Sequence, residues 1–294
     1  MKTLNIIGAG RVGRTLAALW REKHVFTVQD VLSGTPHGTR SAVVFIGAGR
    51  AASWLEDMRP AEVWMLTPPD DKIAHLCERL ARSGLLRPGD IVFHCSGALA
   101  SDELGTAAAA GAQVASVHPL KSFAEPRTAV CTFTGTRCVA EGARAALDVL
   151  QEAFERIGAR VSEIGPQSKT LYHAASVMVC NYLTALLEAG VRTYGEAGLA
   201  RETALAIMEP LVRETVDNVF RLGPARALTG PIARGDEAVV ARHMAALTAW
   251  DARMAGIYKA LGAVALALAR EQGEVGAQAL MRIESLLAGS EVSK

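Results

Sequence analysis

The sequence lacks an excess of charge of either sign. Its 294 residues include 31 Lys and Arg against 30 Asp and Glu, which gives a formal net charge of +1. A chain without a net positive field has no general attraction for nucleic acid or for anionic lipid. We therefore expect neither nucleic acid nor a membrane as a partner, and a small neutral or anionic molecule as the ligand.

Cysteine is scarce and scattered. No two cysteines have the CxxC spacing that zinc sites and redox sites use. The five are Cys77, Cys95, Cys131, Cys138 and Cys180. We expect buried thiols and no metal site.

Long hydrophobic runs are missing as well. The apolar run at the start, in MKTLNIIGAG, is too short for the core of a signal peptide and is interrupted by glycines. The most apolar late stretch, residues 261–269, is well below the roughly 18 to 20 residues needed to span a bilayer. We expect a cytoplasmic protein without a membrane span.

The composition that is present, 50% hydrophobic and 21% charged, is that of a globular protein, and the length suggests two domains. In the first part, short β-branched runs alternate with helical stretches. Strands separated by helices imply right-handed crossovers and a mostly parallel sheet. We predict a doubly wound α/β domain over residues 1–165, with strands at residues 3–7, 25–31, 42–46, 62–66, 91–95, 113–117, 134–139 and 160–164.

After residue 165 the pattern changes to apolar positions three and four residues apart, which indicates helices. We predict an all-α domain over residues 166–294. Its helices are expected at residues 167–196, 200–222, 237–261 and 264–287, with the last one broken near residues 273–276. The many small Ala and Gly residues suit close helix packing between subunits, so we expect a homodimer formed through this domain.

A glycine-rich hexapeptide follows the first predicted strand and opens the first helix. The first glycine permits a tight turn, the second lets backbone N–H groups approach a pyrophosphate, and the third lets helix and strand pack closely. A second strand follows at the distance that a dinucleotide-binding unit requires. We therefore predict that NAD or NADP binds at Gly8, Ala9, Gly10, Arg11, Val12 and Gly13.

The choice between NAD and NADP depends on where the second strand ends. If it ends near Asp30, that carboxylate meets the ribose 2′-hydroxyl and disfavours a 2′-phosphate, as in NAD-binding proteins. If the strand continues to Ser33, Asp30 is a mid-strand acid, and the hydroxyls of Ser33 and Thr35, helped by Arg11 or Arg40, could hold a phosphate. The pattern leaves both interpretations open.

Three later strands end abruptly in polar residues. Thr67 and Pro68 follow the fourth strand, Ser96 follows the fifth and His118 follows the sixth. Ligands on open α/β sheets bind outside the carboxyl ends of the strands, so these three exits are expected to line one crevice. Each exit also fits a turn that merely ends a strand.

Six motifs occur in order along nearly the whole chain: GAGRVG, TPPDD, HCSGALAS, SVHPLKSF, KTLYHAASVMVCNYL and LTGPIARGD. They resemble a family of uncharacterised bacterial Rossmann-like NAD(P)-binding oxidoreductases with a helical C-terminal domain of unknown function. More distantly, the layout is similar to pyrroline-5-carboxylate reductase, ketopantoate reductase and the 6-phosphogluconate and β-hydroxyacid dehydrogenases. The resemblance implies a Rossmann domain, an all-α domain of the 6-phosphogluconate dehydrogenase type that commonly dimerises, and an active site between the two. Relatives often carry Asn-Arg or Ser-Arg after the second strand for the 2′-phosphate, where this chain has Ser33-Gly34.

The resemblance also suggests catalytic residues. In β-hydroxyacid dehydrogenases, a lysine and an asparagine one turn apart on the corresponding helix donate a proton and position the substrate. This chain has Lys169 at the lysine position and His173 where the asparagine stands, with Asn181 about two turns further on the same side. Hydride addition leaves negative charge that an ammonium or imidazolium can neutralise, and a positioned acid contributes roughly 10² to 10⁴ in rate. We assign Lys169 as general acid, His173 as orienter or alternative acid, and Asn181 as an orienting amide; a solvated lysine and a packed surface histidine fit the same pattern.

Other polar residues are candidates for substrate contacts. Ser96 could hydrogen-bond the polar head of the substrate from the opposite wall, and His118 lies at the same predicted edge. Lys121 and Arg234 could hold a substrate carboxylate through charge-assisted bonds. A turn role fits Arg234 equally well, because Asp236 is the natural N-cap of the next helix.

The sequence thus favours an NAD(P)-dependent oxidoreductase that transfers hydride to or from a small carbonyl, imine or alcohol between its domains. A protein that binds NAD(P) as a sensor or scaffold, without turnover, is the alternative. A deazaflavin-linked reductase is a third option, because related Rossmann domains use that coenzyme.

Overall fold

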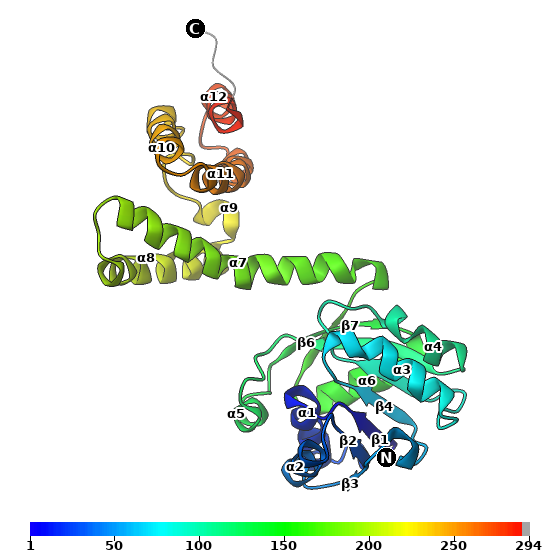
Figure 1. Ribbon diagram of the computed structural model, residues 1–294. Helices are drawn as coiled ribbons and strands as arrows, with labels where there is room; N and C mark the ends of the chain where they lie inside the picture. The colour runs from blue at the N-terminus through cyan, green and yellow to red at the C-terminus, as the bar shows by residue number, and fades with distance from the viewer. Residues whose placement is uncertain (290–294) are drawn as a thin grey trace. The chain divides into compact units, whose positions relative to one another are not determined.

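An eight-stranded sheet forms the N-terminal part of the chain in the computed structural model, which describes residues 1–289 (Figure 1). The strand order is β3-β2-β1-β4-β5-β6-β7-β8, and all neighbours run parallel except β6 and β7, which are antiparallel. The predicted mostly parallel α/β sheet is confirmed. The strands are β1 (Thr3–Ile7), β2 (Thr27–Leu32), β3 (Arg50–Ala51), β4 (Val63–Leu66), β5 (Ile91–His94), β6 (Gln113–Pro119), β7 (Arg137–Gly142) and β8 (Arg160–Glu163).

Helices cover both faces of this sheet, because its strands bury alternate side chains on each side. In β4, Met65 belongs to one hydrophobic core and Trp64 to the other. The first core also contains Trp20, whose indole packs edge-on against Phe26, Phe93 and Phe154. The helices of this part are α1 (Arg11–Glu22), α2 (Pro36–Ile46), α3 (Ile73–Arg82), α4 (Gly105–Ala109), α5 (Pro126–Cys131) and α6 (Arg144–Arg156), with short 3₁₀ turns between them.

One predicted strand is wrong. Residues 42–46 belong to α2, and the strand that pairs with β2 is the short β3 that follows. The β-branched run there suggests a strand, but the segment has helix signals at both ends. Thr35 caps the N-terminus by accepting a hydrogen bond from the Gly38 N–H, and Gly47 ends the helix with a left-handed φ of 72°. Val44 points to solvent, with 81% of its surface exposed, as a residue on the outer face of a helix does.

The rest of the described chain after β8 is helical, as predicted. The predicted end of the third helix is wrong. The helix ends before Asp251, where a new helix begins, and no interruption occurs between residues 261 and 264. Asp251 caps α11 by accepting a hydrogen bond from the Arg253 N–H at 2.7 Å. The predicted break at residues 273–276 is confirmed. The helices are α7 (Lys169–Glu196), α8 (Arg201–Leu222), α9 (Pro224–Ala227), α10 (Glu237–Trp250), α11 (Ala252–Gln272) and α12 (Ala277–Ala288).

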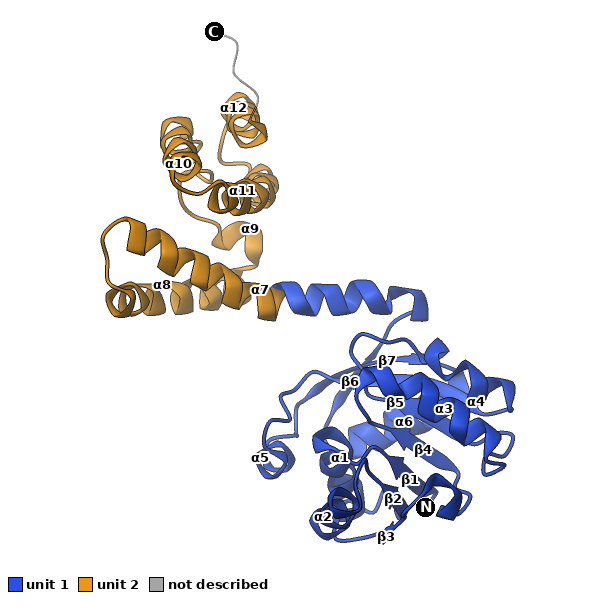
Figure 2. Cartoon of the chain, in the orientation of Figure 1, with its two compact units in different colours: residues 1–178 blue, residues 179–294 orange. Residues whose placement is uncertain are grey.

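The chain divides into two compact units, Met1–Met178 and Val179–Lys294 (Figure 2). The predicted boundary near residue 165 separates the last strand from the first long helix, whereas this division falls inside α7. The first turns of α7, including Lys169, therefore belong to the unit that contains the sheet.

Two helical segments are long and apolar enough to cross a membrane by length and composition: Pro166–Glu196 and Ala252–Gln272. The late apolar stretch at residues 261–269 is part of the second segment, and the absence of a membrane span stays a prediction. Only 11% and 22% of their most apolar windows is buried within the chain. Length and composition do not distinguish a membrane span from a helix of a soluble protein whose apolar face packs against another surface.

Candidate functional site

The glycine-rich loop lies directly against the loop that follows β4. Gly8 has a φ of +86°, and a Cβ atom there would lie 2.4 Å from the backbone nitrogen of Pro68. A Cβ on Gly13 would lie 2.4 Å from Oγ1 of Thr67, which itself donates a hydrogen bond to the Gly8 carbonyl at 2.9 Å. Glycine at both positions is thus required for the two loops to meet at the carboxyl edge of the sheet.

The N-terminus of α1 presents free backbone N–H groups at this edge. Gly10 is the N-cap, no side chain caps the helix, and the first turn contains no acidic residue. A Cβ on Gly10 would have no neighbour closer than 3.8 Å, so space remains above the turn. An uncapped helix N-terminus beside an open glycine, with exposed Arg11 next to it, has the features that bind a diphosphate. The residues present therefore fit the diphosphate of a dinucleotide.

Asp30 does not lie at the tip of its strand. β2 continues to Leu32, and the fully buried Asp30 carboxylate accepts hydrogen bonds from the guanidinium groups of Arg50 and Arg59. Burial acts to raise the pKa of Asp30, but the hydrogen bonds from the two arginines outweigh it and hold the pKa well below its usual range. Asp30 is therefore a mid-strand acid already held by the protein, which is the second of the two interpretations considered for it.

The tip of β2 instead presents hydroxyl groups and the start of α2. The Ser33 N–H donates to Oγ1 of Thr39 at 2.9 Å, and the Ser33 side chain is only partly buried. Thr35 and Arg40 are exposed, and the first turn of α2 contains no acidic residue. This end of the strand therefore offers donors and carries no negative charge.

A row of buried polar side chains crosses three strands of the sheet. His94 of β5 pairs with Ser116 of β6, and Ser116 pairs with Glu141 of β7. Directly paired residues project to the same face of a sheet, so the three side chains form one row. The Glu141 carboxylate accepts two hydrogen bonds from Ser101, from its N–H at 2.8 Å and from its hydroxyl at 2.7 Å.

Lys169, at the start of α7, inserts its ammonium group into this row. Its Nζ donates to Oγ of Ser116 at 2.8 Å, and only 1% of the residue is exposed. Burial lowers the pKa of Lys169, against the attraction of Glu141, which raises it. The lysine predicted as general acid is therefore buried and directed into the protein.

Ser96 links the loops that follow β4 and β5. Its hydroxyl donates to Oδ2 of Asp70 at 2.7 Å and accepts from the N–H groups of Ala98 at 3.1 Å and Leu99 at 3.0 Å. One donor and two acceptor positions are all that a hydroxyl has. All three positions of the Ser96 hydroxyl are thus used within the protein, where it joins the loops that follow β4 and β5.

His118 and Tyr172 bring the end of β6 and the first turn of α7 together. Nδ1 of His118 lies 2.8 Å from the Tyr172 hydroxyl, and the two rings are edge to face. The other side of the imidazole packs on Gly97, where a Cβ would lie 2.8 Å from the ring. Burial and the charge of Lys169 lower the pKa of His118 to about 4, so its ring is neutral at neutral pH.

The remaining predicted site residues are placed less closely. His173 is one turn after Lys169, and its Nδ1 is buried without a hydrogen-bond partner among the described residues. Asn181 and Arg234 are exposed and belong to the second unit, and no hydrogen bond within residues 1–289 joins either to the polar row. Asp236 caps α10 as predicted, by accepting from the Val239 N–H at 3.1 Å. No group of three or more potential metal ligands occurs in the same range.

Tyr172, Ser116 and Glu141 are site residues that the sequence interpretation missed. Ser116 and His118 are two apart in one strand, and Lys169 and Tyr172 are three apart on one helix, so their spacing was a usable signal. Glu141 had no such signal, because only the antiparallel pairing of β7 places it opposite Ser116.

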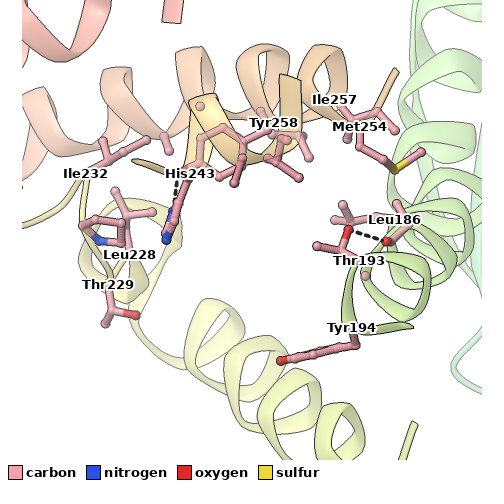
Figure 3. A pocket seen from close by; sticks show the side chains of 18 residues that line it. Leu186, Thr193, Tyr194, Leu228, Thr229, Ile232, His243, Met254, Ile257 and Tyr258 are labelled. Carbon is pink, nitrogen blue, oxygen red and sulfur yellow. Dashed lines mark hydrogen bonds between the residues drawn. The ribbon is translucent and has the colours of Figure 1, made fainter. Parts of the chain in front are cut away.

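A separate cavity lies within the second unit. It has a volume of about 640 Å³ and is lined mainly by apolar side chains of α7, α10 and α11 (Figure 3). Its polar groups include His243, whose Nδ1 lies 3.1 Å from the hydroxyl of Tyr258. All the residues that line it follow Met178, so it lies apart from the glycine loop and the polar row of the first unit.

Two known families match successive parts of the chain. A family described as a Rossmann-like domain matches residues 2–119, and a domain of unknown function, DUF2520, matches residues 136–265. No protein of curated function is detectably similar to this chain in sequence.

Several solved structures share the fold. The protein TM1727 from Thermotoga maritima has a TM-score of 0.75 at 24% identity, over 92% of this chain and 100% of that chain. The provisionally named NADP oxidoreductase BF3122 from Bacteroides fragilis has a TM-score of 0.71 at 21% identity, over 92% of this chain and 97% of that chain. An imine reductase from Myxococcus stipitatus, solved with NAD⁺, has a TM-score of 0.58 at 16% identity, over 100% of this chain and 95% of that chain. The chain therefore combines a Rossmann-like N-terminal domain with a C-terminal region of the DUF2520 type, which begins at β7 of the sheet and continues into the helices that follow β8.

Proposed function

We propose that this protein is a nicotinamide-dependent oxidoreductase that transfers hydride to or from a small carbonyl, imine or alcohol. The observation that carries the proposal is continuity along one sheet edge. The glycine loop contacts Thr67 and Pro68 after β4. Three residues after Thr67, in the same loop, Asp70 accepts a hydrogen bond from Ser96. The residue next to Ser96, Gly97, packs on His118. The glycine loop, which suits a diphosphate, and the cluster formed by Ser116, His118 and Lys169 thus adjoin along the carboxyl edge of the sheet. The likeness to oxidoreductase structures supports this reading.

NADP(H) is the cofactor that we propose. Asp30, the residue that would select a ribose 2′-hydroxyl, is held by two arginines within the strand. Ser33, Thr35 and the start of α2 offer hydrogen-bond donors at the strand tip, and exposed Arg11 and Arg40 supply positive charge. A 2′-phosphate finds compatible groups there and no opposing carboxylate.

Within this proposal, Lys169 acts without touching the substrate. Reduced nicotinamide, when bound, supplies the hydride. The buried ammonium of Lys169 holds Ser116, and its charge adds to the burial that lowers the pKa of the neighbouring His118. Ser96 fixes the loop between the cofactor edge and this cluster. Asn181, His173 and Arg234 remain predictions as substrate contacts.

Calorimetric titration with NADPH and NADH tests the first step, and NADPH consumption over a panel of ketones, 2-oxoacids and cyclic imines tests the second. We expect tighter binding of NADPH and turnover of at least one substrate class. Protein that binds neither nucleotide would overturn the proposal. Binding without turnover across the panel would favour the sensor or scaffold, and turnover with reduced deazaflavin alone would reassign the cofactor.

We also propose a cytoplasmic homodimer formed through the helical part. The apolar windows of α7 and α11 are only 11% and 22% buried within the chain, and large side chains such as Leu211, Phe220 and Val264 are exposed. A second copy would cover these surfaces, and the apolar walls of the cavity in the second unit suit such packing. Light scattering after size exclusion should give twice the chain mass, and fractionation should leave the protein in the supernatant after membranes are pelleted. A monomer, or a protein extracted only by detergent, would refute this part.

A further inference from the structure

We propose that the hydroxyl of Tyr172 delivers the proton to the substrate, with His118 as the positioning residue behind it. This inference rests on the proposed hydride-transfer function and deepens it. It replaces the expectation that Lys169 is the proton donor.

The geometry places Tyr172 at the correct edge. Tyr172 and Lys169 both belong to the first turn of α7, and Nζ of Lys169 lies 5.7 Å from the centre of the tyrosine ring. The tyrosine hydroxyl is 2.8 Å from Nδ1 of His118, at the carboxyl end of β6. His118 in turn contacts Gly97, in the loop that Ser96 ties to the exit of β4. The hydroxyl is therefore connected through packed residues to the loop after β4, which the glycine loop contacts.

The groups around the polar row are used within the protein or closed to a ligand. Lys169 is only 1% exposed and donates one of its three N–H groups to Ser116, and Ser116 also donates to the Ser96 carbonyl at 3.4 Å. Both ring nitrogens of the buried His94 are used, Nε2 with the Ala100 carbonyl and Nδ1 with the Ser96 N–H. Glu141 accepts two hydrogen bonds from Ser101, and Asp70 accepts one from Ser96.

Tyr172 is different, because it has capacity to spare. Its hydroxyl has one donor and two acceptor positions; Nδ1 of His118 lies 2.8 Å from it, and the side chain of Ser176 acts to lower its pKa. Its ring is partly exposed, unlike Lys169. Among the groups named here, it is the one that still has both a proton to give and a surface open to a ligand.

His118 suits the role of a partner to a phenol. A neutral imidazole carries one N–H, and with that proton on Nδ1 it donates to the tyrosine oxygen. The hydroxyl proton of Tyr172 is then directed to a ligand. Burial raises the pKa of Tyr172, so the proton is present at neutral pH.

The chemical step uses the hydride donor, the Tyr172 hydroxyl, His118 and one water molecule. As hydride bonds to the substrate carbon, the electron pair of the C=O or C=N bond moves to oxygen or nitrogen. That atom takes the proton from Oη of Tyr172 as the O–H bond breaks. The phenolate keeps the electron pair and is held by the Nδ1–H of His118 until water returns a proton.

Replacing the hydroxyl alone tests the donor. In Tyr172→Phe, which keeps the ring, we expect kcat to fall about 10²- to 10⁴-fold. The Kd of the variant for NADPH should stay within about threefold of the wild-type value. Tyr182→Phe, on the same helix and exposed, is the matched control and should keep wild-type rates. Active wild type with an equally active Tyr172→Phe would overturn the inference and leave the oxidoreductase proposal standing. Wild type that binds NADPH but reduces nothing in the panel would overturn both.

Nitrogen NMR of the imidazoles tests His118 without turnover. We expect Nδ1 of His118 to carry the proton at neutral pH and its signal to vanish in His118→Asn. The His243–Tyr258 pair, with a similar Nδ1 to hydroxyl distance of 3.1 Å, is an internal reference. A proton on Nε2 instead would mean that Tyr172 donates to His118, which would overturn the inference whatever the turnover. His118→Asn, whose amide can replace Nδ1, should lose less activity than Tyr172→Phe.

Discussion

Gly13 approaches Thr67 so closely that a Cβ atom would lie 2.4 Å from Oγ1 of the threonine. That oxygen also donates a hydrogen bond to the Gly8 carbonyl, so it cannot move aside without breaking the contact between the two loops. The third glycine of the motif is therefore required by the β4 loop as well as by helix packing.

Gly13→Ala should lower the free energy of unfolding by about 1 to 3 kcal/mol, because overpacking forces the loops apart. In a Thr67→Ala background the same change should cost much less, and urea unfolding of the four proteins in a double-mutant cycle measures the difference. Gly105→Ala is the control, since a Cβ there meets nothing within 4 Å. Additive costs would show that the contact does not constrain residue 13.

Asp30→Asn separates structural support from cofactor binding. The carboxylate accepts hydrogen bonds from two charged donors, so its loss should lower the free energy of unfolding by about 2 to 4 kcal/mol. NADPH binding should change little. Glu209→Gln, which breaks only an exposed pair with Arg213, is the control and should cost less than about 1 kcal/mol. A large loss of NADH affinity with normal stability would instead identify Asp30 as a ribose ligand.

The pH dependence of that difference has a definite sign. The pKa of Asp30 is lowered in the folded state, so its contribution is complete above the unfolded pKa of about 4 and is lost as pH falls below it. Urea unfolding at decreasing pH should bring wild type and Asp30→Asn together. A gap that widens in acid would contradict the assignment.

Much of the first unit could be predicted because its signals are local. β1 was predicted residue for residue, since a buried apolar run leads directly into the glycine turn. At α2 the β-branched run predicts a strand, but the caps at Thr35 and Gly47 stabilise a helix over the whole segment. The break at Asp251 has the same origin, because an Asp N-cap is visible in sequence but is easily read as an exposed helix position.

The candidate site could be predicted only in part. The sequence motifs indicate Lys169, Ser96 and His118 as site residues. The directions of their side chains, however, depend on contacts between distant segments. His118 and Tyr172 are 54 residues apart, and Lys169 meets Ser116 across 53 residues. Strand register and the docking of α7 determine these contacts, and neither follows from spacing along one element.

Ser33→Glu tests the proposed preference for NADP. A carboxylate at the tip of β2 would repel a 2′-phosphate and could accept from a ribose hydroxyl. The Kd for NADPH should rise at least about tenfold, or about 1.4 kcal/mol, whereas the Kd for NADH should hold or fall. Ser162→Glu, on the exposed part of β8, controls for added charge. Equal weakening of both nucleotides would contradict a phosphate site at Ser33.

His94 is a buried neutral histidine, with Nε2 3.0 Å from the Ala100 carbonyl and Nδ1 3.2 Å from the donating Ser96 N–H. Burial lowers its pKa to about 4. An unfolded histidine has a pKa near 6.5, so between about pH 6.5 and pH 4 the unfolded chain binds the extra proton. The folded state should therefore lose stability as pH falls through this window.

His94→Gln removes this titration and keeps an amide that can bond to the loop. Wild type should lose up to about 3 kcal/mol more than the variant between pH 7 and pH 4, measured by urea unfolding. The variant should be the less stable protein at pH 7, because the imidazole fits both partners, and should approach or overtake wild type near pH 4. His75→Gln, an exposed histidine on α3, should leave the wild-type slope unchanged. Parallel pH curves for wild type and His94→Gln would mean that His94 is protonated in the folded protein, and its Nδ1 could then not accept from the Ser96 N–H.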